Sequence, residues 1–332
     1  MRPFPDWLIM RALRRTTLLL MTQDIQTLLE KRLGVTHARQ RLGIESEKGH
    51  HVFGKGINFF HPENWYSTHS LIKQIIRLSG MYGRGQRNAC KIQVRENTVR
   101  IPDLPKNFDG YTLLHLSDLH VDMYDAATDA LIDTISSLDY DLCALTGDYR
   151  AQTYGEITGA MEGMQRVTEA IKTPMYGVLG NHDSITMVPY LESYGIQMLL
   201  NESVELERAG ERIHLSGIDD AHYFRVENIQ KATENVPSDT VSVMLSHTPE
   251  IYRQVAYAGF NLMLCGHTHG GQICLPGGIP VTLDSKCPRY MGKGSWRFQD
   301  MHGYTSVGSG TSIVNVRFNC LPEVTLHRLC TG

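Results

Sequence analysis

The stretch Leu113-Leu114-His115-Leu116-Ser117-Asp118-Leu119-His120 decides the fold, because an apolar run ends abruptly in Asp-x-His. A short apolar run of this kind predicts a strand that is buried on both faces. In open α/β sheets, chemistry gathers just beyond the carboxyl ends of such strands. We therefore expect a carboxylate and an imidazole to reach a functional site together at Asp118 and His120.

Four more apolar runs along the chain are followed by residues that can bind a metal. The apolar runs 142–146, 176–179, 241–246 and 262–265 are followed by Gly147-Asp148, Gly180-Asn181-His182-Asp183, His247 and Gly266-His267-Thr268-His269. A Gly-Asp pair alone is a common turn, and a lone histidine is usually a core or surface residue. Five such motifs, each directly after an apolar run, predict instead that the strand ends converge on one metal centre.

The donor types narrow the choice of metal. The candidate ligands are four imidazoles, two carboxylates and one amide: Asp118, His120, Asp148, Asn181, His247, His267 and His269. Mixed nitrogen and oxygen donors without thiolate suit Mn, Fe or Zn better than Ca or Mg. Seven donors exceed one tetrahedral site, so we expect two divalent ions that share a bridging carboxylate, with Asp148 as the candidate bridge. Such a pair clamps the oxygens of a displacement at phosphorus, which predicts phosphate ester hydrolysis.

His182 and Asp183 are the candidate catalytic residues. If Asn181 binds an ion, the neighbouring His182 lies close to the substrate and is a suitable proton donor to the leaving oxygen. We expect Asp183 to hold the His182 imidazole through a hydrogen bond and to stabilise its protonated form.

Residues 1–90 differ from residues 91–332, and we predict a basic N-terminal extension followed by one catalytic domain. The first 90 residues carry 14 Lys and Arg against 6 Asp and Glu. Apolar residues at helical spacing predict amphipathic helices over 18–33 and 71–77, the latter ended by Gly80, Gly83 and Gly85, while 34–65 reads as irregular. Basic amphipathic helices can lie in an anionic membrane interface or dock on the domain or a partner subunit. The two are not exclusive, and we favour docking, because most amphipathic helices dock.

From residue 91 onwards the pattern favours an α/β fold. Alternating apolar residues predict a strand or hairpin at 91–101, a hairpin at 203–217 and strands at 304–308, 312–318 and 323–329. Helix-like segments at 126–138, 157–171 and 249–258 alternate with strands. Together these elements predict two packed mixed sheets with helices outside.

The cysteines and the apolar runs bear on location. Seven cysteines without a C-x-x-C pair suggest a reducing compartment rather than a disulfide framework. No apolar run reaches the ~18–20 residues that span a bilayer. Arg14-Arg15 resembles a twin-arginine export signal, but the apolar run after it is short and no small-residue cleavage site follows. We expect a cytoplasmic protein, peripheral on the inner membrane face.

Taken together, the motifs Asp118-x-His120, Gly147-Asp148, Gly180-Asn181-His182-Asp183, His247 and Gly266-His267-Thr268-His269 resemble the calcineurin-like metallophosphoesterase superfamily. The resemblance runs from about residue 91 to the end and implies a four-layer α/β/β/α sandwich with a dinuclear centre. It implies that Asp118, His120, Asp148 and His269 hold one ion and that Asp148, Asn181, His247 and His267 hold the other. It also implies that His182 contacts the scissile phosphate, although Asp183 stands where many members have Glu.

Three further segments carry a finer resemblance to the branch of the YaeI- and YkuE-type phosphodiesterases and the chlamydial-type UDP-2,3-diacylglucosamine hydrolases. They are Gly217-Ile218-Asp219-Asp220, His269-Gly270-Gly271-Gln272-Ile273 and Arg317-Phe318-Asn319-Cys320-Leu321-Pro322-Glu323.

Some residues in and near these segments have two possible roles. Asp219 and Asp220 either order the site or cap a turn. Elsewhere, Arg150 either reaches a phosphate oxygen or is solvated. Gly270, Gly271, Gly277 and Gly278 either admit a long substrate or serve as turns.

We expect a phosphodiesterase or pyrophosphatase that acts on an amphiphilic substrate, such as a nucleotide-linked lipid precursor of the UDP-2,3-diacylglucosamine type. The ligand set equally permits a phosphomonoesterase, for instance a protein phosphatase. A metal-binding scaffold without catalysis is a third class, which the retention of His182 beside a full ligand set disfavours. We expect no nucleic acid partner.

Overall fold

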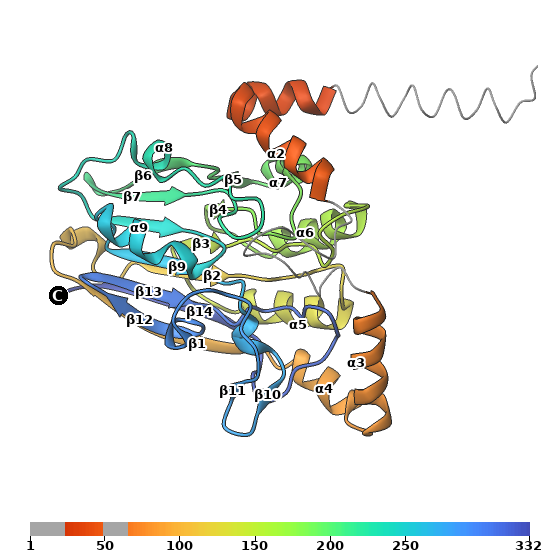
Figure 1. Cartoon of the computed structure of the whole chain (residues 1–332). Helices are drawn as coiled ribbons and strands as arrows, with labels where there is room; N and C mark the ends of the chain where they lie inside the picture. The colour runs from red at the N-terminus through yellow and green to blue at the C-terminus, as the bar shows by residue number, and fades with distance from the viewer. Residues whose placement is uncertain (1–23, 49–65) are drawn as a thin grey trace, which may run out of the picture.

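Two six-stranded sheets form the centre of the molecule in the computed structural model, which describes residues 24–48 and 66–332 (Figure 1). The first sheet has the order β1 (Gln93–Ile101), β14 (Glu323–Thr331), β2 (Thr112–Leu116), β3 (Leu142–Leu145), β4 (Met175–Gly177) and β5 (Ile196–Met198). The second has the order β12 (Gly294–Phe298), β13 (Met301–Thr305), β9 (Leu262–Cys265), β8 (Ser242–Leu245), β7 (Glu211–Gly217) and β6 (Glu202–Arg208). Two mixed sheets were predicted, and the structure confirms them.

Most neighbouring strands within each sheet run parallel. Strands β2, β3, β4 and β5 pair in parallel, and so do β7, β8, β9 and β13. The antiparallel pairs are β14 with β2, β6 with β7, and β12 with β13. Because parallel strands end at the same edge of a sheet, the loops after β2, β3 and β4 lie together, as do those after β8 and β9.

Alternation along each strand explains why the sheets stack. In β3, Leu142 and Ala144 belong to the apolar cluster between the two sheets, while Cys143 and Leu145 belong to the cluster on the outer face. In β9, Leu264 lies in the same inner cluster and Met263 in an outer one. Successive strand residues point to opposite faces, so these near-continuous apolar runs bury both sides of their sheets.

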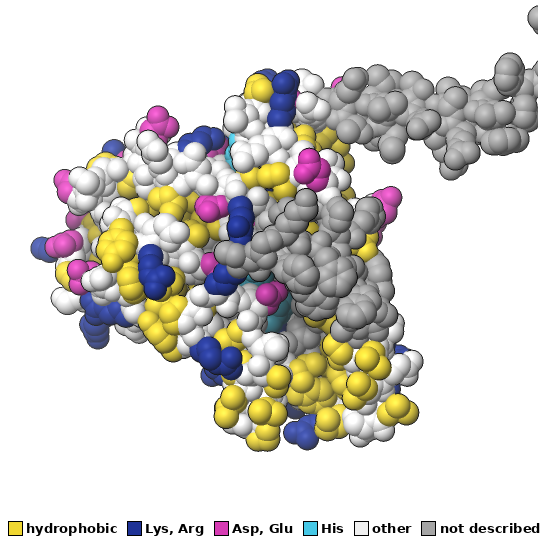
Figure 2. All heavy atoms as spheres, in the orientation of Figure 1, with side chains coloured by type: hydrophobic (Ala, Val, Ile, Leu, Met, Phe, Trp, Pro, Cys, Tyr) yellow, Lys and Arg dark blue, Asp and Glu magenta, His cyan; other side chains and the backbone are white. Residues whose placement is uncertain are grey.

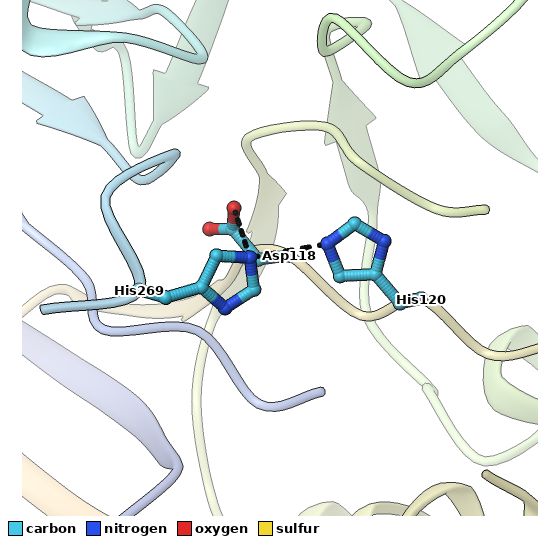
Figure 3. Close-up of side chains that lie close together, drawn as sticks. All are labelled: Asp118, His120 and His269. Atoms are coloured by element: carbon cyan, nitrogen blue, oxygen red, sulfur yellow. Dashed lines mark hydrogen bonds and ion pairs between the residues drawn. The ribbon is translucent and has the colours of Figure 1, made fainter. Parts of the chain in front are cut away.

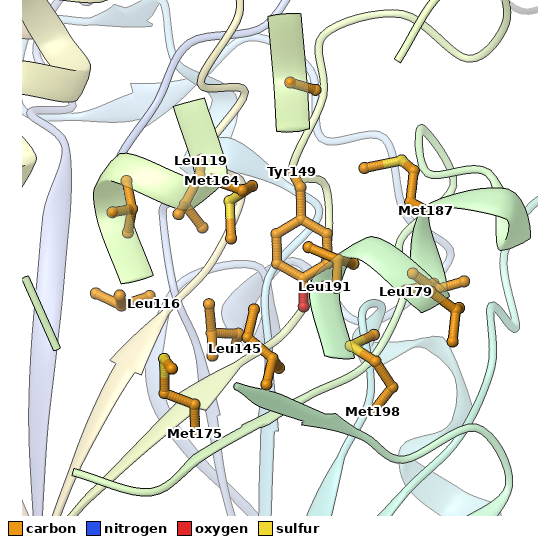
Figure 4. Close-up of a cluster of buried hydrophobic side chains, with 14 of the residues drawn as sticks. Leu116, Leu119, Leu145, Tyr149, Met164, Met175, Leu179, Met187, Leu191 and Met198 are labelled. Atoms are coloured by element: carbon orange, nitrogen blue, oxygen red, sulfur yellow. The ribbon is translucent and has the colours of Figure 1, made fainter. Parts of the chain in front are cut away.

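Helices cover the two outer faces. The first sheet carries α5 (Asp125–Ile135), α6 (Thr158–Glu169) and α7 (Val188–Ser193), and α8 (Ile229–Thr233) and α9 (Tyr252–Tyr257) pack on the second. Figure 4 shows Leu and Met side chains of the first outer cluster around the buried ring of Tyr149. The architecture is thus the predicted α/β/β/α sandwich.

Short elements link these layers. Single turns of 3-10 helix are η2 (Lys106–Phe108), η3 (Ile185–Met187), η4 (Pro249–Ile251), η5 (His269–Gly271) and η6 (Arg289–Met291). A small antiparallel hairpin, β10 (Cys274–Leu275) with β11 (Ile279–Pro280), follows η5. Gly277 and Gly278 both have positive φ in its turn, so these two glycines serve the hairpin.

Most of the elements predicted after residue 91 are present. The hairpin at 203–217 is β6 and β7, and the helix predicted at 249–258 is split into η4 and α9. Residues 93–101 form one continuous strand, parallel to β14, rather than a hairpin. The strand predicted at 312–318 is wrong: apart from a single bridge between Ile273 and Phe318, the segment is irregular. Its alternating Val314 and Val316 pack beneath helices rather than in a sheet.

The N-terminal extension is more helical than predicted. Residues 24–33 form a helix, in agreement with the expected amphipathic segment, whose first part (18–23) lies outside the described residues. The expectation of an irregular 34–65 is wrong for α2 (Val35–Lys48), and 49–65 lies outside the described residues. Apolar periodicity misses α2 because polar side chains, Arg41 and Glu45, stand among its contacts with the domain.

Two further helices precede β1: α3 (Tyr66–Leu78) and α4 (Tyr82–Ala89). The amphipathic helix predicted around 71–77 is confirmed as α3. Gly83 and Gly85 do not end it but lie within α4. A Cβ on Gly85 would come within 2.6 Å of the Val316 side chain, so glycine there permits close packing.

Within residues 24–48 and 66–332, no helix has both the length and the apolar character needed to cross a bilayer. The seven cysteines all lie in the described part, and none forms a disulfide there.

Candidate metal centre

All seven predicted metal ligands lie together where the two sheets present their strand ends. Asp118 and His120 follow β2, Asp148 follows β3 and Asn181 follows β4, while His247 follows β8 and His267 and His269 follow β9. Five of them have positive φ: Asp118, His120, Asp148, His267 and His269, between 41° and 72°. Such backbone is strained for residues with a Cβ, and strain of this kind clusters at functional sites.

One group of ligands consists of Asp118, His120 and His269 (Figure 3). The Nε2 atoms of His120 and His269 are 3.1 Å apart, and Oδ1 of Asp118 lies 3.4 Å from Nε2 of His269. Two ligand atoms about 2.1 Å from one ion are about 3 Å apart when they subtend about 90° at it. The spacing of this group therefore fits a single cation.

A second group surrounds Nε2 of His247. That atom lies 2.9 Å from Oδ1 of Asn181, 3.2 Å from Nδ1 of His267 and 3.3 Å from Oδ2 of Asp148. The two groups meet at Asp148, whose Oδ2 is also 3.8 Å from Nε2 of His120. The carboxylate of Asp148 thus lies between the two groups.

The backbone around the bridge is closely fitted. A Cβ on Gly180 would come within 2.1 Å of Oδ1 of Asp148, so only glycine leaves room for the carboxylate. The amide of His182 donates to that same oxygen at 2.9 Å. Although burial opposes ionisation, the imidazoles of His247 and His182 hold the pKa of Asp148 well below its usual range.

The hydrogen bonds of two histidines test whether a cation fits. Nδ1 of His120 lies 2.7 Å from the carbonyl of Arg150, and Nδ1 of His247 lies 2.8 Å from that of Thr146. A ring nitrogen facing a carbonyl carries the proton, so in the neutral rings each Nε2 presents a lone pair to the cluster. Lone pairs that converge with carboxylate and amide oxygens, away from water, need a positive charge among them. The residues present therefore fit metal ions.

The charge balance supports the same reading. Burial opposes protonation of His247, yet the neighbouring charge of Asp148 raises the pKa of His247 to about 10. Burial lowers the pKa of His267 and of His269 well below the usual range. The neighbouring carboxylate thus favours positive charge at His247, while burial disfavours it at His267 and His269.

His182 lies at the centre, but its partner is not the predicted one. Its Nε2 is 3.9 Å from Oδ2 of Asp148, and its Nδ1 is 2.8 Å from the carbonyl of Ala151. Asp183 does not hold the imidazole. Its carboxylate accepts from the backbone amides of Asp148 and Gly180 through Oδ2 and from that of Tyr149 through Oδ1, each at 2.8 Å. Asp183 therefore shapes the loops that carry Asp148 and Asn181.

Two weaker candidates prove to be structural. Arg150 is buried and its guanidinium donates to the carbonyls of His182, Thr153 and Gly155, so it braces loops rather than facing solvent. Asp220 caps a turn, because its carboxylate accepts from the amides of three following residues, His222, Tyr223 and Phe224.

Sequence reasoning missed two neighbours of the ligands. The wholly buried guanidinium of Arg317 donates to the carbonyls of Val307, Gly308 and Gly310, and its Nη2 lies 3.3 Å from Nδ1 of His269. The ring of His222 is 4.1 Å from that of His267, centroid to centroid, and His222 also faces Glu250 at 3.2 Å. Arg317 belongs to one of the three segments that carry the finer resemblance, so the sequence could have indicated it. Nothing in the spacing of His222 distinguished it from a core histidine.

The N-terminal helix α2 also reaches the site. Nη2 of the buried Arg41 donates to the carbonyl of Asp183 at 2.8 Å, and its guanidinium stacks over the ring of Phe224 at 3.3 Å. Glu45 accepts from the Ile185 amide and from the Ser184 hydroxyl, both at 2.7 Å. The extension therefore contacts the chain immediately after His182.

Asp219 joins the same contact from the domain side. Its Oδ2 is 2.8 Å from Nε2 of His37, and its Oδ1 is 3.8 Å from Nε of Arg41. The sequence left open whether Asp219 caps a turn or orders the site. In the structure it also pairs with side chains of α2.

Comparison with known proteins agrees with this geometry. The model of the calcineurin-like phosphoesterase family matches residues 111–271. The metallophosphoesterase YkoQ of Bacillus subtilis is 32% identical over 74% of this chain and 93% of its own length. YkuE of the same organism is 28% identical over 72% and 85%, and the phosphodiesterase YaeI of Escherichia coli is 27% identical over 69% and 86%. The chain therefore belongs to the calcineurin-like phosphoesterase family and is a metal-dependent phosphoester hydrolase.

Proposed function

We propose that the chain is a phosphodiesterase or pyrophosphatase that works with two divalent ions, Mn, Fe or Zn. One ion would be held by Asp118, His120, His269 and the shared Asp148. The other would be held by Asp148, Asn181, His247 and His267. The observation that carries the proposal is the carboxylate of Asp148, which lies between two groups of candidate ligands, each of which combines residues from both sheets. When bound, such ions neutralise phosphoryl charge and lower the pKa of water that acts as nucleophile.

The chain's own contribution centres on His182. The carbonyl of Ala151 fixes the ring, with its Nδ1 turned away and its Nε2 toward the bridge. From there a protonated Nε2 would donate to the leaving oxygen of the ester. The hydrogen bond to Ala151 keeps this orientation before substrate arrives, which is the form of preorganisation that catalysis uses.

The substrate we propose is amphiphilic, of the type of a nucleotide-linked lipid precursor such as UDP-2,3-diacylglucosamine. Similarity to a phosphodiesterase supports the diester preference, and the basic composition of residues 1–90 supports contact with an anionic membrane, from the cytoplasmic face. In the described part of the extension, Leu29 and Leu33 are buried in the main core, so that face docks on the domain. The membrane contact must then involve other residues.

The test is a substrate panel with the Mn²⁺-loaded full chain. It compares a generic diester, a generic monoester and UDP-linked acylated sugars, with D148N as the control for contaminating phosphatases. We expect the diester and the UDP-linked sugars to be cleaved faster than the monoester, and each activity to vanish in D148N. Preferred cleavage of the monoester would replace this proposal with a phosphomonoesterase.

A further inference from the structure

An apolar surface lies outside the site already described, at the end of the molecule formed by α3 and the β10–β11 hairpin. Six side chains there expose half or more of their surface: Leu71 (60%), Ile75 (58%), Leu78 (86%), Leu275 (54%), Ile279 (57%) and Val281 (61%). We call these six the apolar platform. Figure 2 shows yellow side chains gathered at the lower end of the view, below a recess that contains histidine. Contiguous exposed apolar patches of this kind mark interaction sites.

Helix α3 carries two apolar stripes, only one of which has a partner within the described chain. Ile72 and Ile76 pack with Val314, Val316 and neighbouring residues. Leu71, Ile75 and Leu78 follow at i, i+4 and i+7 on a second stripe, which faces outward. A helix that needs only to dock requires one stripe, so the second is free to meet something else.

The two halves of the platform belong to one packed unit. Ile273, directly before β10, packs in the same cluster as Ile72 and Ile76 of α3. The amide of Cys274 donates to the carbonyl of Phe318, which also belongs to that cluster. The hairpin and α3 thus adjoin one apolar cluster and lie at the same end of the molecule, with α4 drawn between them (Figure 1).

The charged residues around the apolar platform indicate what kind of partner it binds. Residues 66–95 contain six Lys and Arg and no Asp or Glu. Arg84 and Arg87 of α4 are exposed beside the helix half. On the hairpin half, Arg289 donates to the carbonyl of Pro280, and Lys293 to that of Gly278, both at 2.7 Å. An exposed apolar surface with a purely basic helical flank fits the interface of an anionic bilayer.

The platform is connected to the metal centre through a few residues. β10 follows His269 after one 3-10 turn. On the other side, the amide of Arg317 donates to the carbonyl of Gly85, and the side chain of Asn88 donates to the carbonyl of Arg317. Since the Arg317 guanidinium contacts His269, the platform and the ligands share one rigid support.

We propose that the apolar platform inserts into the headgroup region of an anionic membrane and holds the metal centre at the level of lipid phosphates. The inference rests on the proposed function, because it assigns the membrane contact proposed there to a defined surface. The occupant is the bilayer, not a second copy of the chain.

The test is co-sedimentation of the full metal-loaded chain with vesicles of phosphatidylcholine, with and without phosphatidylglycerol. The double variant L78D/I279D places charge in both halves of the platform. Its matched control is Y257D on α9, since Tyr257 is also an exposed apolar side chain (72%) and lies outside the platform. R84E reverses a flanking charge, and R253E on α9 is its control.

We expect the wild type to bind the anionic vesicles and to be released by high salt. L78D/I279D should bind about tenfold more weakly or less, R84E should lose part of the affinity, and both α9 controls should bind like the wild type. No vesicle binding by the wild type, equal binding by L78D/I279D, or a dimer of the wild type that only the platform variants dissociate would each overturn the proposal. Hydrolysis of a soluble diester by the platform variants reports separately on the proposed function, and should match the wild type.

Discussion

A histidine's role in this protein is decided by what surrounds its two ring nitrogens. His115 lies on β2 only a few residues from His120, yet it is a core residue: Thr146 and His327 face its nitrogens, and burial lowers its pKa to about 3. His120 is equally buried, but its Nε2 faces a second imidazole and a carboxylate. Burial alone therefore does not mark a ligand; convergence of acceptors does.

At the residue scale, His182 and Asp148 should separate catalysis from metal binding. In H182N the metal ligands remain and only the proton donor is lost, so kcat should fall about 10²–10⁴-fold while the metal content is unchanged. In D148N both groups of ligands lose their shared member, so metal content and turnover should fall together. Elemental analysis beside a diester assay measures both. Metal loss in H182N would show that the ring is a ligand rather than a donor.

At the scale of elements, α2 behaves as part of the site although it lies outside the matched family region. It places Ala38, Leu42 and Ile44 in apolar clusters, and its polar side chains Arg41 and Glu45 bind the backbone just after His182. A helix held in this way gives little apolar periodicity, which is why the sequence predicted an irregular segment. Structure that depends on a buried polar network is visible only once the partners are in place.

Arg41 should therefore contribute far more to the stability of the fold than Arg39, which lies on the same helix. R41M removes a buried cation from the carbonyl of Asp183 and leaves Asp219 without its guanidinium, which should cost about 3–5 kcal/mol of unfolding free energy. R39A breaks an ion pair with Glu30 whose Arg side chain is 62% exposed, and should leave the free energy of unfolding nearly unchanged, since solvent screens the pair. Urea unfolding of both variants decides this; equal losses would mean that α2 is only loosely attached.

The stability that the contact between α2 and Asp219 provides should also depend on pH. Burial opposes ionisation of Asp219, but Arg41 and His37 hold its pKa below the ordinary value of 3.8. A lowered pKa in the folded state means that the stabilisation is complete above about pH 4 and is lost as pH falls through the folded value. The stability gap between wild type and D219N, measured by urea unfolding, should shrink as pH falls below about 4. A gap that grows as pH falls below about 4 would contradict the assignment.

At the scale of the whole molecule, the two mixed sheets and the strands that carry the candidate ligands could be predicted, because both follow from local pattern. Apolar runs that end in Asp, Asn or His fixed the sheets and brought the ligands to one edge. The partner of His182 and the packing of 312–318 could not be predicted. Both depend on which loops meet in space, and alternation or adjacency along the chain does not encode that.

Bound metal should stabilise the whole fold, because the ligands come from both sheets. Asp118 and Asp148 belong to the first sheet and His247 and His269 to the second, so ions would link the two layers. Ions that bind only the folded state raise its stability, by about 2.7 kcal/mol at a hundred times the dissociation constant. At roughly 2–4 °C per kcal/mol for a domain of this size, chelation should lower Tm by about 5–10 °C.

Differential scanning calorimetry with and without a chelator measures this shift, and added Mn²⁺ should restore the original Tm. D148N is the matched variant: its Tm should respond much less to the chelator, because the bridge between the two groups of ligands is gone. If wild type and D148N respond equally, the stabilising ions lie elsewhere. If neither responds while hydrolysis still requires metal, the ions bind too weakly to hold the sheets together, and the fold alone must gather the ligands.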